Sequence, residues 1–273
     1  MSTRQSRSAF TSVDRIVDSR REKSQDRVAV EEPLEIRLNG KSVVVVMRSP
    51  GNDEELAAGF LHTEGILKSK SELRSIGRKR ERRKPDLGNV VEVVSTDTSD
   101  LKNRGWQRNF VSASSCGLCG KLTIESVRLA APPVRGDRLT VPAATLYGLV
   151  DKMRAEQAGF DETGGIHAAG LFDEKGKLLT LREDIGRHNA VDKVVGAALL
   201  EDALPLRSRI LVVSGRASFE IVQKALMARI PFVAAVSAAS SLAVELAESS
   251  AMGLVGFLRG SSMNVYTGAE RIT

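Results

Sequence analysis

Residues 210–236 read ILVVSGRASFEIVQKALMARIPFVAAV and contain the pattern that decides the fold. Two apolar runs, at 210–213 and 231–236, are suited to buried strands. Between them, Ser214-Gly215-Arg216 predicts a turn, and apolar residues at helical spacing predict a helix from Phe219 to Arg229. Buried strands that alternate with helices are typical of an α/β protein with a largely parallel sheet.

The same alternation extends over residues 136–273, which we predict to form an α/β domain. Apolar periodicity and turn residues predict helices at 143–157, 186–200 and 240–250, and strands at 167–172, 178–182, 253–258 and 264–267.

Residues 29–135 predict a smaller N-terminal part that is rich in β-structure. Alternating residues on both sides of Asn39-Gly40 are a strong signal for a β-hairpin. The predicted elements are strands at 33–38, 42–47 and 90–95, and a helix at 53–63 that begins with an acidic turn.

Two charged segments are expected to lie outside this framework. Residues 1–28 are polar and contain few apolar positions, so the composition predicts a disordered basic tail. The basic run at residues 78–84 precedes Pro85 and reads as a solvated loop in preference to a nucleic-acid patch.

The composition restricts the classes of partner. The formal net charge is +6, which favours anionic partners, whereas aromatic residues make up only 4% and argue against a surface that stacks nucleotide bases. No run of 18 apolar residues exists, and the N-terminus lacks the apolar segment of a secretory signal. We therefore expect a cytoplasmic protein that binds neither membranes nor nucleic acid.

The two cysteines of the chain, Cys116 and Cys119, lie in the run SSCGLCG at residues 114–120. Such a pair could be half of a metal site, a thioredoxin-like redox pair, or a thiol that carries a transferable group. A structural zinc site needs four ligands, and no second Cys-x-x-Cys exists, so we expect no metal. The glycines and serines predict a mobile loop, which suits a carrier better than a rigid redox motif.

Three further clusters of polar residues follow predicted strands. The first surrounds Arg187 and His188 at the opening of a predicted helix, where an anion could bind. The second is Ser214-Gly215-Arg216, directly after the apolar strand at 210–213, where ligands collect in open α/β sheets. The third follows the strand at 253–258 and includes Arg259. His167 follows Thr163-Gly164-Gly165-Ile166, and a half-buried structural histidine explains it as well as a functional one does.

Several of these motifs, taken together, resemble the FdhD/NarQ family of formate dehydrogenase accessory sulfurtransferases. The resemblance runs from about residue 28 to the C-terminus. The motifs that carry it are Glu32-Pro33-Leu34 with Asn39-Gly40, LAAGFL at 56–61 with Glu64-Gly65, CGLCG at 116–120, TGGIH at 163–167, DIGRHNAVDK at 184–193, Ser214-Gly215-Arg216 and NVYT at 264–267.

The resemblance implies a fold, a cargo and a set of partners. It implies a three-layer α/β main domain similar to cytidine deaminase, a homodimer, and a persulfide on Cys116. Sulfur would come from a cysteine desulfurase and pass to the molybdenum cofactor, a bis-molybdopterin guanine dinucleotide, before insertion into formate dehydrogenase. The cofactor segment of the family corresponds to Phe257, Leu258, Arg259, Gly260, Ser261 and Ser262.

We therefore interpret the chain as a sulfur carrier in which Cys119 assists Cys116. A guanine nucleotide is a candidate ligand, and the candidate binding residues besides the 257–262 segment are Arg187, His188, Ser214, Gly215 and Arg216. A chaperone that only binds and inserts the cofactor remains the principal alternative, and a redox enzyme is the third.

Overall fold

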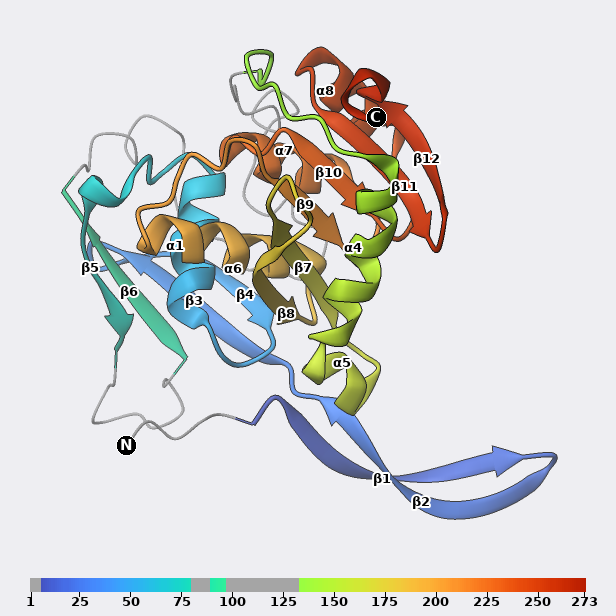
Figure 1. Cartoon of the computed structure of the whole chain (residues 1–273). Helices are drawn as coiled ribbons and strands as arrows, with labels where there is room; N and C mark the ends of the chain where they lie inside the picture. The colour runs from blue at the N-terminus through green and yellow to red at the C-terminus, as the bar shows by residue number, and fades with distance from the viewer. Residues whose placement is uncertain (1–5, 80–88, 97–132) are drawn as a thin grey trace.

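A computed structural model describes residues 6–79, 89–96 and 133–273, and its centre is a six-stranded sheet (Figure 1). The strand order is β12-β11-β10-β9-β7-β8. Residues 210–236 form β9 (Ile210–Val213), α7 (Phe219–Met227) and β10 (Phe232–Ala235). A helical crossover returns the chain to the same end of the sheet, so β9 and β10 are parallel, as predicted.

The sheet is mixed, so the prediction of a largely parallel sheet is wrong. The strand β11 (Gly253–Arg259) extends the parallel set, but β12 (Ser262–Thr267) is antiparallel to it. On the other side of β9, β7 (His167–Phe172) is antiparallel both to β9 and to β8 (Leu178–Asp184), the last strand of the sheet. The short connections between β7 and β8 and between β11 and β12 can join only antiparallel strands.

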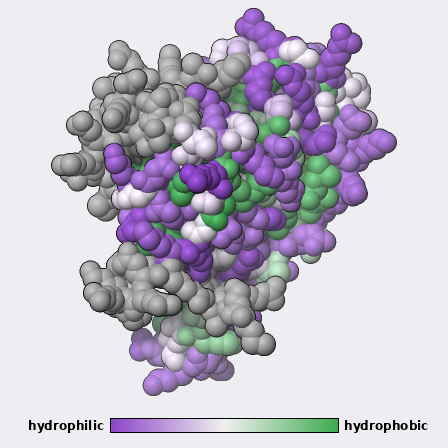
Figure 2. Space-filling model, turned by 90° about the vertical axis from the view of Figure 1, so that its left-hand side faces the viewer, coloured by the Kyte–Doolittle hydropathy of each residue, from purple (hydrophilic) through white to green (hydrophobic). Residues whose placement is uncertain are grey.

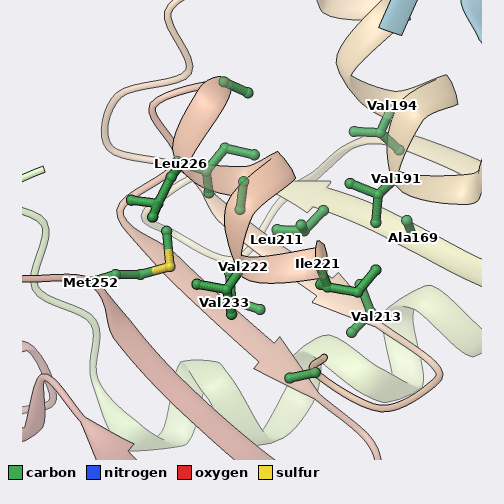
Figure 3. Close-up of a cluster of buried hydrophobic side chains, with 14 of the residues drawn as sticks. Ala169, Val191, Val194, Leu211, Val213, Ile221, Val222, Leu226, Val233 and Met252 are labelled. Carbon is green, nitrogen blue, oxygen red and sulfur yellow. The ribbon is translucent and has the colours of Figure 1, made fainter. Parts of the chain in front are cut away.

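Helices cover both faces of this sheet and make a three-layer α/β arrangement. The helices α6 (Arg187–Leu200), α7 and α8 (Ser241–Ser249) pack on one face, and α4 (Ala143–Ala155) packs on the other. In Figure 3, valines and leucines of α6 and α7 point at those of the central strands. The predicted α/β class is confirmed, and the similarity to cytidine deaminase stays a prediction.

The N-terminal part contains a four-stranded sheet in the order β4-β3-β6-β5. Asn39 and Gly40 both have positive φ angles, 48° and 79°, as the predicted hairpin turn requires. The strand β5 was not predicted, and neither was the helix α5 (Ala158–Thr163) of the main domain. The bounds are β3 (Glu32–Leu38), β4 (Lys41–Arg48), β5 (Leu73–Arg78), β6 (Val90–Ser95) and α1 (Asp53–Thr63), and two 3₁₀ helices span Lys70–Glu72 and Ala269–Arg271.

The helices α1 and α6 join the two sheets through an unusually close crossing. A Cβ atom on Gly59 would lie 1.8 Å from the carbonyl oxygen of Asp192, and one on Gly196 would lie 1.8 Å from that of Glu55. Only glycine permits this approach of two backbones. Leu199 of α6 consequently belongs to the same hydrophobic cluster as α1 and the four-stranded sheet.

The prediction of a disordered tail at residues 1–28 is wrong for its described portion. The strands β1 (Ser8–Val17) and β2 (Arg20–Ala29) pair along their whole length in an antiparallel hairpin. Asp18 and Ser19 form the two-residue turn with φ angles of 47° and 67°. Low apolar content argued against burial, but a hairpin is held by main-chain bonds and cross-strand pairs.

The cysteine loop lies outside the described residues, as do residues 80–84 of the basic run. No helix in the described part of the chain is long and apolar enough to cross a membrane.

Candidate functional site

The candidate residues of the main domain meet at one edge of the six-stranded sheet. The parallel strands β9, β10 and β11 end at this edge, and β7 begins there because it is antiparallel to β9. Three strand spacings of about 4.8 Å separate β7 from β11, so the edge is about 14 Å wide. Ser214-Gly215-Arg216 lies after β9 near its middle, as the sequence predicted (Figure 1).

His167, on the first residue of β7, is connected to the loop after β9. The Ala168 amide donates to Ser214 Oγ at 2.9 Å, and Ser214 Oγ lies 3.4 Å from His167 Nδ1. With its oxygen already accepting from the amide, the Ser214 hydroxyl can donate its proton to Nδ1. This arrangement favours the neutral imidazole with its proton on Nε2. His167 is therefore part of the site and not simply a structural histidine.

Gly215 brings the loop after β9 against the start of α6. A Cβ atom at this position would lie 3.4 Å from Arg187 Cδ and 3.4 Å from His167 Cε1. The absence of a side chain leaves the main chain of the loop against these two groups. Arg187 and His167, which are twenty residues apart in sequence, thus flank a single glycine.

His188 is bound on the other side by the beginning of α7. Its Nε2 lies 3.0 Å from Glu220 Oε2 and 3.3 Å from Ser218 Oγ. Ser218 precedes the first residue of α7, and Glu220 belongs to its first turn. The carboxylate holds the imidazole in place, so the beginning of α7 orients the ring of His188.

A buried ionic network fixes the start of α6 beneath the site. Lys193 Nζ lies 2.7 Å from Asp184 Oδ2 and donates to the carbonyl oxygen of Ser49 at 3.1 Å. Asp184 Oδ1 accepts from the Gly186 amide at 2.8 Å and from Asn189 Nδ2 at 2.9 Å. An internal carboxylate thus lies at the N-terminus of α6, where the sequence predicted an external anion.

Charged residues of the run at 184–193 are buried in the core. Asp184, Asp192 and Lys193 are each at most 1% exposed. They can be buried because each charge has a counter-charge and hydrogen-bond partners.

The predicted cofactor segment at residues 257–262 lies beside the end of β10. The Phe257 amide donates to the carbonyl oxygen of Ser237 at 3.1 Å, and Arg259 Nε donates to that of Val236 at 3.1 Å. Phe257 has a positive φ of 50°, which turns its ring outward from the strand. The side chain of Leu258 is fully buried in the core, so only its main chain could contact a ligand. Gly260, Ser261 and Ser262 are exposed at the turn into β12.

The surroundings of His167 at this edge disfavour its protonated form. Burial is the main cause that lowers the pKa of His167, and the positive charge of Arg187 lowers it further. We expect the Arg187→Gln variant to raise this pKa, because a positive charge next to the ring is removed. NMR titration of the imidazole protons can measure it directly, since the chain has only three histidines.

The matched control is Arg207→Gln. Arg207 precedes β9 and therefore lies at the opposite edge of the sheet, so its replacement should leave the His167 titration unchanged. A pKa of His167 that is the same in Arg187→Gln and in the unmodified chain would contradict the electrostatic account.

Comparison with known proteins assigns the chain to a family. A model of the FdhD/NarQ family matches residues 29–273, which is nearly the whole chain. The chain belongs to the FdhD/NarQ family. The predicted resemblance to this family is thereby confirmed.

Relatives of this FdhD/NarQ member carry a common description. This chain is 50% identical over 271 residues to "Sulfur carrier protein FdhD" of Streptomyces coelicolor, and the match covers 95% of this chain and 94% of the relative. The protein of the same name from Saccharolobus solfataricus is 41% identical over 261 residues, covering 94% and 95%.

A solved structure has the same fold. The crystal structure of a candidate formate dehydrogenase accessory protein from Desulfotalea psychrophila superposes with a TM-score of 0.77 at 26% identity. The superposition covers 97% of this chain and 99% of that protein.

Two residues of the site were not predicted as ligand or positioning groups, namely His167 and Glu220. Their signal was position: His167 begins a strand, shortly after two glycines, and Glu220 lies in the first turn of a helix that follows a buried strand. Within the described residues, no group of three or more His, Cys, Asp and Glu side chains could hold a metal ion.

Proposed function

We propose that this protein is a sulfur carrier, and therefore a sulfurtransferase, that serves formate dehydrogenase maturation. The observation that carries the proposal is full-length identity of about one half to relatives named sulfur carrier protein. The chain has only two cysteines, so the carrier thiol must be Cys116 or Cys119. We assign the persulfide to Cys116, the first cysteine of the motif, and a relay or release role to Cys119.

Loading of Cys116 is a thiol–persulfide exchange. The Cys116 thiolate attacks the terminal sulfur of a persulfide on a cysteine desulfurase. A new sulfur–sulfur bond forms on Cys116, the old one breaks, and the thiolate of the desulfurase leaves. The step needs no net oxidation, which suits a protein in the reducing cytoplasm.

The cargo would bind at the edge of the six-stranded sheet. A bis-molybdopterin guanine dinucleotide is large and anionic, and this edge carries Arg187, Arg216 and Arg259 together with serine hydroxyls. Gly215 lets the main chain after β9 lie directly against Arg187 and His167, so a phosphate bound at this loop would lie beside the Arg187 side chain. In this proposal the protein receives sulfur, places it on the bound cofactor and passes the cofactor to formate dehydrogenase, as a homodimer.

Mass spectrometry of the intact protein tests the carrier role. After incubation with a cysteine desulfurase and cysteine, we expect the addition of one sulfur atom to the unmodified chain and none to Cys116→Ala. A Cys119→Ala variant should still gain the sulfur. An adduct of equal amount on Cys116→Ala would exclude Cys116 as the carrier. If a Cys116→Ala/Cys119→Ala variant still matured formate dehydrogenase, the chaperone function would replace this one.

The histidine resonances test the cargo site. Titration with guanosine diphosphate should shift the resonances of His167 and His188 and leave those of His62 unchanged. His62 lies near the last residue of α7, with Nε2 3.3 Å from the carbonyl oxygen of Met227, whereas His188 contacts the first turn. A nine-residue helix is about 13 Å long, so the two positions are well separated.

A further inference from the structure

The β1–β2 hairpin is an arm that leaves the body of the protein (Figure 1). Its described polar contacts with the body lie near its base: Ser8 Oγ donates to Glu162 at 2.7 Å, and Arg27 forms an ion pair with the same carboxylate at 3.4 Å. Ten residue pairs extend from this base to the turn without a bulge. At about 3.3 Å per residue, the arm is about 30 Å long.

Exposed large hydrophobic side chains are concentrated on the arm. Figure 2 shows a face of the molecule on which hydrophilic residues predominate. Nine large hydrophobic side chains in the described chain are exposed, and four of them lie on this hairpin. They are Phe10, Ile16, Val17 and Val28, with exposed fractions between 40% and 70%.

Isolated two-stranded hairpins are at best marginally stable in water, and no other strand of the described residues pairs with either edge of this one. A further strand on either edge would satisfy main-chain groups and cover apolar side chains. The charges of the hairpin are nearly balanced, with five basic and four acidic residues between positions 8 and 29. Such a surface does not select a polyanion, but it can pair with a surface that carries both signs.

The register of the hairpin determines which groups its β1 edge offers. Val17 and Arg20 flank the two-residue turn and therefore exchange both of their main-chain hydrogen bonds. This pattern alternates along the strand, so the even-numbered residues of β1 direct their N–H and C=O groups outward. A strand that joins this edge must pair with Ser8, Phe10, Ser12, Asp14 and Ile16.

We propose that the β1 edges of two copies of this chain pair antiparallel about a two-fold axis at Val13. Phe10 then lies opposite Ile16 of the partner subunit, and Ser12 lies opposite the partner's Asp14. Val13 faces its own copy across the axis. The pairing creates a four-stranded sheet. It places Phe10 against Ile16 at two symmetric positions and places no like charges opposite each other.

Other registers are less favourable. Moving the axis to Asp14 places two carboxylates opposite each other, and moving it to Ser12 places Phe10 opposite the partner's Asp14. On the β2 edge, two-fold pairings bring like charges together, such as Arg21 opposite the partner's Arg27. The sequence of the hairpin is therefore self-complementary at one edge and in one register.

Sedimentation of the full chain over a range of concentrations tests the pairing. The inference names a surface for the homodimer proposed above and so rests on that part of the proposed function. Phe10→Glu and Ile16→Lys should each weaken dimerisation at least about tenfold, because each variant places a charge against an apolar side chain at two symmetric positions. The Phe10→Glu/Ile16→Lys variant should restore the dimer, because glutamate and lysine then face each other. The matched control, Phe10→Glu/Val17→Lys, has the same charges in the wrong register and should stay dissociated.

A cross-link provides an independent readout. In a Cys116→Ser/Cys119→Ser background, oxidation should link Val13→Cys to its copy, because facing residues across antiparallel strands lie within disulfide reach. Thr11→Cys should remain unlinked, since it faces Arg15 of the partner subunit. If the unmodified chain is a dimer that Phe10→Glu does not weaken, the homodimer survives and the arm is excluded as its interface. If the unmodified chain is a monomer at all concentrations, both proposals fail.

Discussion

The Gly59→Ala variant is expected to lose about 3 kcal/mol of unfolding free energy, because overpacking of a close contact has effects of this size. The added methyl group would lie 1.8 Å from the carbonyl oxygen of Asp192 and 2.8 Å from the amide nitrogen of Gly196. Neither atom can move without moving α6. The helices α1 and α6 must separate, and the cluster that joins the two sheets through Leu199 loses contact.

Gly148→Ala is the matched control for this measurement. Gly148 lies within α4, and a Cβ atom there meets nothing within 4 Å. Alanine favours a helix over glycine by roughly 1 kcal/mol, so this variant should be neutral or slightly more stable. Urea unfolding followed by circular dichroism compares the two. A Gly59→Ala protein as stable as Gly148→Ala would mean that α1 and α6 are not in close contact in solution.

The second large effect is expected for Lys224→Met. Lys224 Nζ donates to both carboxylate oxygens of Asp192, at 2.9 and 2.8 Å, and to Thr63 Oγ1 at 3.0 Å. Asp192 and Lys224 are only 1% and 6% exposed. Removal of the ammonium leaves a buried carboxylate without its counter-charge, which costs about 3–5 kcal/mol.

Two further variants separate this ion pair from a general loss of packing. The Lys224→Met/Asp192→Leu variant should regain most of the stability, because apolar residues of similar volume often replace a buried pair without loss. Lys175→Met, at an exposed turn, should change the unfolding free energy by no more than about 0.5 kcal/mol. Equal effects of Lys224→Met and Lys175→Met would contradict the burial and pairing of Lys224.

The agreement between prediction and structure was best where local signals are strong. The helix at 53–63, the strand at 210–213 and the hairpin turn at Asn39-Gly40 were located correctly, because periodicity and turn chemistry depend on neighbouring residues. The β1–β2 hairpin was missed because cross-strand pairs such as Phe10 with Arg27 do not resemble an apolar strand. Strand direction in the six-stranded sheet was predicted only for the crossover segments.

The candidate site shows the same division. The positions of Ser214-Gly215-Arg216 and Arg187 followed from their place after a strand and at the opening of a helix. The partners of His188 and His167 did not, because Glu220 and Ser214 are brought to them by the packing of α7 and β9. No property of residues 183–193 alone indicates that Asp184 is buried against Ser49, which is more than a hundred residues away.

The sequence by itself determined the α/β class, the family and the two thiols, because motifs, periodicity and composition are properties of the chain alone. Only the tertiary structure decided that His167, Arg187 and Gly215 share one sheet edge, and that the charges of α6 are buried and paired. Those features depend on how distant segments pack. The distance between α1 and α6, for example, is set by a pair of glycines where the two helices cross. The arm belongs to the same category, since its register becomes defined only when the strands pair.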